Sequence, residues 1–328
     1  MVYTGCPFRD KRVVVTGGCG FIGSHLVEAL WRDNHVVVVD NLASGTDFNL
    51  NGFDIDFIRH DIIGGLDDVF AGADVVFHTA AEVQVASSVQ DPEKDASTNI
   101  LGTISVLNAA RSARVGRVVY SSSAAVYGVP ESLPISETHP TKPVSPYGLS
   151  KLTGERYLLM YHRLENLPVV CLRYFNVFGS RQRADSPYSG VISIFARNLV
   201  QGLPSVVHGD GEQLRDFVHV SDVVRANLMA ASVPVEKAVG RVFNVGTGYA
   251  TSLNRLIEAL GLPKESVRYG PERTGDLRDS VADVNLIREA MGFQAQTSLG
   301  QGLADYVAWL TKDGDQPWEA PASATPAE

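Results

Sequence analysis

The stretch TGGCGFIGSHL at residues 16–26 decides the fold. It follows a valine-rich run, Arg12–Thr16, with the composition of a strand buried on both faces. Glycines stand at positions 17, 20 and 23, and apolar side chains recur at helical spacing from Phe21 to Trp31. A tight glycine turn between a first strand and a helix lets backbone N–H groups and the helix N-terminus meet a pyrophosphate. The stretch therefore predicts a dinucleotide site.

The end of the second predicted strand, HVVVVD at His35–Asp40, indicates which dinucleotide binds. Asp40 can accept hydrogen bonds from the adenosine ribose hydroxyls and would repel a 2′-phosphate, so NAD is favoured over NADP. Asp61 and Ile62 close the third strand, and small alanines in HTAAE at 78–82 let the backbone approach the cofactor. His78 is expected to be a packed strand-end histidine. The expected cofactor contacts are Gly17, Gly20, Phe21, Ile22, Gly23, Asp40, Asn41, Asp61, Ile62, Ala80, Ala81, Asn99, Tyr147 and Lys151.

Strand-like runs alternate with helical segments through the first half of the chain. The predicted strands are Arg12–Thr16, His35–Asp40, Asp56–His60, Asp74–His78, Arg117–Ser121 and Val169–Tyr174. The predicted helices between them include Phe21–Trp31, Asn99–Ala113 and Pro146–Glu165. Such alternation predicts parallel pairing with right-handed crossovers. The expected fold is α/β, a Rossmann-type doubly wound parallel sheet with a smaller C-terminal substrate-binding lobe.

The expected domain boundaries follow from the same alternation of strands and helices. Residues 11–176 form the NAD-binding domain, to which 241–262 return through a strand near Arg241–Gly246. Residues 177–240 and 263–311 form the substrate-binding lobe, with helices near Val191–Val200, Asp222–Ala231, Ser252–Leu260 and Leu299–Leu310. Residues 312–328, rich in Pro, Ala and Glu, are expected to be a disordered tail.

Composition excludes several classes of function. A formal net charge of -9 gives no basic face for a nucleic acid. The three cysteines, Cys6, Cys19 and Cys171, have neither metal-ligand spacing nor the pattern of a disulfide framework. No apolar run is long enough for a membrane span and no signal peptide precedes the first strand. A cytoplasmic location, without nucleic acid, metal or membrane, is therefore expected.

Two runs in the middle of the chain carry the chemistry: YSSSAAVYG at 120–128 and SPYGLSK at 145–151. Tyr147 and Lys151 lie four residues apart on a predicted helix, so their side chains share one face. A free tyrosine has a pKa of about 10, which is too high for a base at neutral pH. A nearby ammonium and a positive nicotinamide ring would lower it. Ser123 is placed to bind the same substrate hydroxyl.

Together these runs resemble the extended short-chain dehydrogenase/reductases of the nucleotide-sugar epimerase/dehydratase family, over roughly residues 11–311. Further matching pieces are LRYFNVFG, GDGEQLRDFVHVSD, FNVGTG and RTGDLRDSVAD. The resemblance implies that Ser123, Tyr147 and Lys151 are catalytic, that Lys151 also binds the nicotinamide ribose, and that a homodimer forms through the helices Asn99–Ala113 and Pro146–Glu165.

The resemblance also favours one reaction. Sugar dehydratases and decarboxylases of the family carry acidic residues just after the serine, where this chain has Ala124 and Ala125. Alanine transfers no proton, whereas a 4-epimerase needs only reversible hydride transfer at C4. A UDP-hexose 4-epimerase is expected, acting on UDP-glucose and UDP-galactose and on their N-acetylated counterparts UDP-GlcNAc and UDP-GalNAc. UDP-glucuronate 4-epimerisation, an atypical dehydration and a non-catalytic NAD-binding regulator stay open.

Arginines are expected to bind the diphosphate of the UDP-sugar. Guanidinium groups match phosphate oxygens in pairs, which suits Arg215 and Arg273, with Arg278 a further candidate. The resemblance assigns the diphosphate region to Asn176 and the uridine ribose to Asp276. It also places Ser280 beside C2 of the sugar, where a small residue would admit an N-acetyl group. The expected substrate contacts are Gln84, Ser123, Tyr147, Asn176, Arg215, Arg273, Asp276 and Ser280, with Ser88 a further possible sugar contact.

Overall fold

The structure is a computed structural model that describes residues 5–183, 190–272 and 277–312. Its centre is a parallel sheet of seven strands, in the order β11-β6-β5-β4-β1-β2-β3. Those strands are β1 (Arg12–Thr16), β2 (His35–Asp40), β3 (Asp56–Arg59), β4 (Val75–His78), β5 (Arg117–Ser123), β6 (Val169–Tyr174) and β11 (Arg241–Val245). Every neighbouring pair is parallel, which confirms the predicted Rossmann-type fold.

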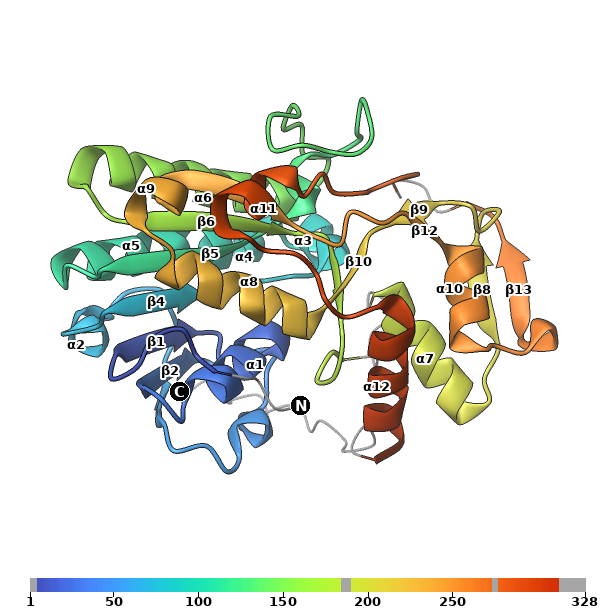
Figure 1. Ribbon diagram of the computed structural model, residues 1–328, viewed down its shortest axis with the longest axis horizontal. Coiled ribbons are helices and arrows are strands. Elements are labelled where there is room, and N and C mark those ends of the chain that lie inside the picture. Colours follow the sequence, from blue (N-terminus) through green and yellow to red (C-terminus); the bar gives the residue numbers. More distant parts are fainter. Residues whose placement is uncertain (1–4, 184–189, 273–276, 313–328) are drawn as a thin grey trace, which may run out of the picture.

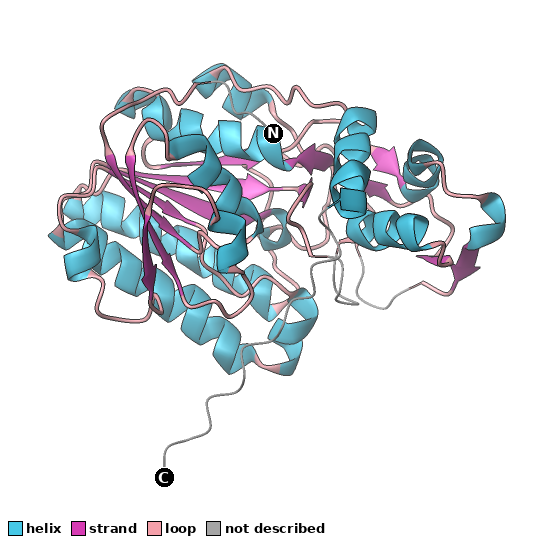
Figure 2. Ribbon diagram, turned by 90° about the horizontal axis from the view of Figure 1, so that it is seen from below, coloured by secondary structure: helices cyan, strands magenta, loops and turns pink. Residues whose placement is uncertain are grey.

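Helices cover both faces of the sheet, as Figure 2 shows. One face packs its valines against α1 (Phe21–Leu30), α8 (Val220–Ser232) and α11 (Asn285–Met291), with the short α9 (Val235–Ala238) beside them. The other face packs against α2 (Asp67–Phe70), α5 (Gly102–Ser112) and α6 (Pro146–Glu165). Alternate residues of each strand serve the two faces: Val13 and Val15 enter the first core and Val14 enters the second.

A short helical segment joins the fourth strand to α5. It consists of α3 (Val85–Gln90), α4 (Pro92–Ala96) and one π-helical turn, Ser97–Leu101. The sequence predicted a single helix over Asn99–Ala113, whereas the first residues of that range belong to the π-turn. Single π-turns of this kind are frequent at functional sites.

The smaller C-terminal lobe lies at the carboxyl ends of the strands (Figure 1). Its apolar core joins α7 (Val191–Gln201), α10 (Leu253–Leu260) and α12 (Leu299–Lys312). Three two-stranded pairs accompany it: β7 (Asn176–Phe178) with β10 (Phe217–His219), β9 (Leu214–Arg215) with β12 (Thr251–Ser252), and β8 (Ser205–His208) with β13 (Val267–Gly270). Short 3-10 turns occupy Asp47–Leu50, Ala124–Val126 and Lys264–Ser266.

The predicted start of the C-terminal tail can be compared with the structure. Lys312, assigned to the tail from the sequence, is the last residue of α12, and 313–328 lie outside the described residues. Within the described part of the chain, no helix is long and apolar enough to span a membrane.

Candidate active site

A cleft of about 1910 Å³ opens where the strand order reverses between β1 and β4. Parallel sheets of this type bind ligands at such a reversal, beyond the carboxyl ends of the strands. Single small-molecule pockets measure about 300–1,000 Å³, so this cleft has room for a dinucleotide and a second ligand together. The glycine turn after β1, the loop after β4 and the end of β5 all line it.

The glycine turn leaves no room for side chains. Gly17 has φ +72°, and a Cβ built on it would lie 2.6 Å from the backbone N of Ala80. A Cβ on Gly23 would collide with the carbonyl oxygen of Gly17. Gly20 caps α1 without a side-chain hydrogen bond, so the first N–H groups of α1 face the cleft uncovered by a cap. Phe21 and Ile22 also line the cleft. This cradle fits the pyrophosphate of a dinucleotide.

Asp40 stands at the end of β2 beside that turn. Its carboxylate accepts hydrogen bonds from Cys19 N at 2.9 Å and Leu42 N at 2.8 Å, and burial raises its pKa. Each oxygen keeps a second lone pair for a ligand hydroxyl. Asn41 donates its amide to Asp61 Oδ2 at 2.8 Å, which joins the ends of β2 and β3. Together with Ile62, these side chains line the same end of the cleft.

The opposite wall is the loop that follows β4. His78 is buried, bonded to Thr16 Oγ1 at 2.8 Å and to Thr103 Oγ1 at 3.0 Å, and burial lowers its pKa to about 3. It is therefore neutral, as expected of a packed strand-end histidine. Ala80 and Ala81 face the cleft.

Asn99 secures this loop from the π-turn. Its Nδ2 donates to Glu82 O at 3.0 Å, and its Oδ1 accepts from Glu82 N at 2.9 Å. Asn99 is buried and is absent from the described residues that line the cleft. In this structure its amide group therefore holds the loop in place.

Ser123, Tyr147 and Lys151 all line this cleft. Ser123 is the last residue of β5, and Tyr147 and Lys151 stand one turn apart near the start of α6. Ser145 caps that helix by accepting from Gly148 N at 3.1 Å. A hydrogen bond joins the Tyr147 hydroxyl to Ser123. The predicted spacing thus brings the three side chains together.

In the absence of a nicotinamide ring, burial dominates the protonation of this group. Burial is the main influence on Tyr147 and raises its pKa, against which the bond to Ser123 acts. The Lys151 ammonium donates to Ser121 O at 2.9 Å and lies 5.0 Å from the centre of the Tyr120 ring. Burial lowers the pKa of Lys151 to about 8. In the ligand-free protein, burial therefore outweighs any stabilisation of the Tyr147 phenolate.

The two residues expected near the sugar both line the cleft. Gln84 lines the cleft, where its Oε1 accepts from Ser87 Oγ at 2.8 Å. Ser88 is buried: its hydroxyl donates to Val85 O at 2.7 Å and accepts from Tyr147 N at 3.1 Å. Ser88 thus braces the N-terminus of α6, which the sequence alone did not indicate.

The expected diphosphate residues lie in the smaller lobe. Arg215 donates to the carbonyl oxygens of Leu277 at 2.7 Å and Arg278 at 2.9 Å, and the backbone of Ser280 pairs with that of Arg215. Ser280 is buried. Asn176 donates through its side chain to Asp216 O at 3.3 Å.

None of these three predicted substrate residues is among the described residues that line the cleft. Arg273 and Asp276 fall outside the described residues. Arg278 forms a two-pronged ion pair with Asp210, with both distances 2.9 Å.

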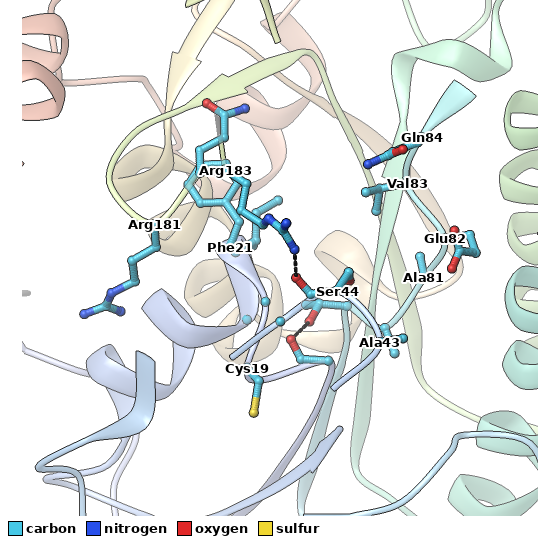
Figure 3. Close-up of a pocket in the computed structure, with 18 of the residues that line it drawn as sticks. Cys19, Phe21, Ala43, Ser44, Ala81, Glu82, Val83, Gln84, Arg181 and Arg183 are labelled. Atoms are coloured by element: carbon cyan, nitrogen blue, oxygen red, sulfur yellow. Dashed lines mark hydrogen bonds between the residues drawn. The ribbon is translucent and has the colours of Figure 1, made fainter. Parts of the chain in front are cut away.

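Two arginines at the mouth of the cleft were missed by the sequence analysis. Arg183 donates to Ser44 O at 3.3 Å, in the loop after β2, whereas Arg181 points away from that loop (Figure 3). Arg181 instead pairs with Glu28 of α1 at 2.6 Å. Nothing in the run SRQR distinguishes these residues from solvated surface charges, since their partners lie about 140 or more residues away along the chain.

Comparison with known proteins agrees with this geometry. The model of the NAD-dependent epimerase/dehydratase family matches residues 13–246. A UDP-glucose 4-epimerase of Mycolicibacterium smegmatis is 41% identical over 91% of this chain and 98% of its own length.

Solved structures give the same result. A UDP-N-acetylglucosamine 4-epimerase of Methanobrevibacter ruminantium, solved with UDP-N-acetylmuramic acid, has a TM-score of 0.89 at 38% identity, covering 93% of this chain and 99% of that one. A UDP-glucose 4-epimerase of Thermotoga maritima, solved with UDP-glucose, has a TM-score of 0.85 at 38% identity, covering 92% and 99%. With its glycine cradle, its Ser123–Tyr147–Lys151 group and these matches, the chain belongs to the NAD-dependent epimerase/dehydratase family.

Proposed function

We propose that this protein is a UDP-hexose 4-epimerase that interconverts UDP-glucose with UDP-galactose and UDP-GlcNAc with UDP-GalNAc. The observation that carries the proposal is the meeting of Ser123, Tyr147 and Lys151 at the glycine cradle, with alanines at the next two positions. The three epimerases named above, which match this chain over nearly its whole length, support the same activity.

Each of these residues has its own role in the proposed reaction. Ser123 holds the C4 hydroxyl of the sugar, and Tyr147 takes the proton from that oxygen and returns it. Lys151 supplies a positive charge beside Tyr147, since an ammonium stabilises a nearby phenolate. The glycine cradle and Asp40 would hold NAD, whose nicotinamide supplies reversible hydride transfer at C4 when it is bound. Removal and return of the C4 hydroxyl proton are the only acid–base steps that the chain must provide.

The two positions that follow Ser123 carry no acid or base. Ala124 and Ala125 form the 3-10 turn that follows Ser123, so the backbone there presents methyl groups instead of carboxylates. Dehydration or decarboxylation would need an acid or base in this place. UDP-glucuronate 4-epimerisation requires no such group and is the second candidate.

We propose that the smaller lobe binds the nucleotide part of the substrate. Arg215 and Arg273, with Asn176 and Asp276, would hold the uridine diphosphate while the sugar turns over. Arg215 already has its guanidinium beside the chain that leads to 273–276, because it binds the carbonyl oxygens of Leu277 and Arg278. The division into an NAD-binding domain and a substrate-binding lobe is part of this proposal.

A homodimer is also proposed, with a second copy of this chain covering the outer face of α6. Leu149 and Leu164 are 55% and 72% exposed, and Met160 is 37% exposed. Their separations of 11 and 4 residues place them on one stripe of the helix. Leu101, the last residue of the π-turn before α5, is also exposed. Apolar stripes of this kind mark protein interfaces.

Product analysis tests the activity. The purified protein is incubated with UDP-glucose, UDP-GlcNAc and UDP-glucuronate, and the products are identified by NMR. We expect UDP-galactose and UDP-GalNAc, with the cofactor unchanged in amount. A 4-keto-6-deoxy product would identify a dehydratase, and inversion of UDP-glucuronate alone would favour the second candidate.

A further inference from the structure

A buried carboxylate in the wall of the active-site cleft has no part in the proposed reaction. Asp95, in α4, is 2% exposed and lines the cleft. Its neighbours in the run PEKDA are polar and α4 lies near the surface, so the sequence gives no sign that this carboxylate is enclosed. Burying a carboxylate is costly unless other groups satisfy it. The surroundings of Asp95 therefore need an explanation.

Asp95 is bound to two side chains that position the catalytic residues. Asn99 Nδ2 donates to Asp95 Oδ1 at 2.8 Å and also lies 3.1 Å from Ser150 Oγ. The Ser150 hydroxyl lies 3.0 Å from the carbonyl oxygen of Tyr147 and within hydrogen-bonding reach of Asp95. Its single proton can serve one of these acceptors at a time. Asp95 thus joins the π-turn to the first turn of α6.

The charge of Asp95 acts on both catalytic groups. A negative charge favours a nearby ammonium and disfavours a nearby phenolate. Asp95 accordingly raises the pKa of Lys151 and the pKa of Tyr147, although burial is the larger influence on each. Burial likewise raises the pKa of Asp95 itself.

We propose that Asp95 is a positioning residue of the active site, which fixes the first turn of α6 through Asn99 and Ser150 and sets a negative charge in the cleft that Lys151 also lines. This inference rests on the proposed role of Lys151 beside Tyr147. The inference gives α4 a part in catalysis without any proposed contact between Asp95 and the substrate.

The other charged and titratable groups around Lys151 do not replace Asp95. Glu155, one turn further along α6, also favours the ammonium, but its carboxylate is bound to Arg173 at 2.7 Å. Tyr120 of β5 presents its ring, and His78 of β4 is neutral.

The loop after β4 contributes one further acid beside Asp95. Glu82 acts on Asp95 and pairs with Lys94 at 2.9 Å. Asp95 of α4 therefore differs from these acids. It acts on Lys151 and forms no ion pair with any of the described residues.

The test removes the charge of Asp95 and keeps its shape. In Asp95→Asn, the titration of Lys151 is followed in the ligand-free protein by NMR of 13Cε-labelled lysine, with Lys151→Met to assign the signal. We expect the midpoint to fall by roughly 0.5 to 1 pH unit. The pH profile of kcat should move to lower pH by a similar amount, because both Lys151 and Tyr147 lose the influence of the same negative charge. The KM for the UDP-sugar should change less than twofold.

Glu93→Gln is the matched control, since Glu93 is an exposed acid on the same helix. It should leave the Lys151 midpoint and the profile unchanged. Asp95→Ser, which also removes the charge, serves if the amide variant folds poorly by thermal melting. An unchanged midpoint in folded Asp95→Asn or Asp95→Ser would overturn the inference, as would an equal shift in Glu93→Gln. The NMR titration needs no turnover, so a failure of the proposed activity would be recognised separately.

Discussion

The two halves of the molecule place their functional side chains in different ways. In the N-terminal half, Gly17, Asp40 and Ser123 stand at or just beyond the ends of parallel strands, and Tyr147 and Lys151 share one helix. In the C-terminal half, Arg215 is held by contacts with residues 277–280, more than 60 positions away in the sequence. One half places its groups through regular elements, the other through pairings between distant segments. Variants in the first half should therefore change the chemistry or the use of the cofactor, and variants in the second should change selectivity for the sugar.

The largest effect is expected from Tyr147→Phe. This variant removes the oxygen that moves the proton and keeps the ring, so turnover should fall about 10²-fold or more with the fold intact. Steady-state kinetics and circular dichroism provide the measurement. Tyr157→Phe, on the same helix, should keep wild-type turnover. Wild-type activity in Tyr147→Phe would place the proton transfer on another group and break the contrast between the halves.

The next effect tests selectivity in the smaller lobe. Ser280 is buried and its backbone pairs with Arg215. Ser280→Tyr should fill the space proposed for the N-acetyl group, at a cost of about 1–3 kcal/mol. The kcat/KM for UDP-GlcNAc should fall about 5- to 150-fold, and that for UDP-glucose should fall less. Ser280→Ala should keep both activities. A wild-type enzyme inert towards both N-acetylated sugars would disprove this role of Ser280.

The smallest effect concerns the choice of cofactor. Asp40→Asn removes the negative charge and leaves one acceptor oxygen, so only one of the two hydrogen bonds from Cys19 N and Leu42 N can be kept. The preference for NAD over NADP should therefore fall by about tenfold, since the repulsion of the 2′-phosphate is lost. Binding of both dinucleotides is measured by calorimetry. Asp56→Asn, an exposed acid on β3, should keep the preference. Equal binding of NAD and NADP by the wild type would contradict the role given to Asp40.

Most of the main sheet could be predicted because its signals are local. The bounds of β1, β2, β6 and α6 agree with the sequence prediction, since each is a continuous apolar run or is bounded by a clear start signal such as Ser145-Pro146. The end of β5 was missed by two residues, because the serines at 122 and 123 have low strand propensity and are held by pairing with β6. Tertiary pairing decides such positions.

The parts that escaped prediction depend on contacts between distant residues. Strands β8 and β13 are four residues each and about 60 positions apart, so neither shows a period of its own. Asp95 was missed because its enclosure comes from Asn99 of the π-turn and Ser150 of α6, which lie apart from it in the sequence or on another element. Ser88 lines the cleft, but its hydrogen bond to the backbone of Tyr147, 59 residues later, could not be predicted. Polar residues reveal such roles only when the fold is known.

Asp216 bears on the order in which the two halves can form. Its buried carboxylate accepts from Thr247 N at 2.8 Å, Thr247 Oγ1 at 2.6 Å, Gly248 N at 2.9 Å and Ala282 N at 3.2 Å. Those partners lie 31 to 66 residues away along the chain. Closing such loops costs entropy before any bond rewards it, and contacts of this range slow folding. We therefore expect the smaller lobe to assemble late on an already folded sheet, which would make nascent or truncated chains bind NAD before they can bind a sugar nucleotide.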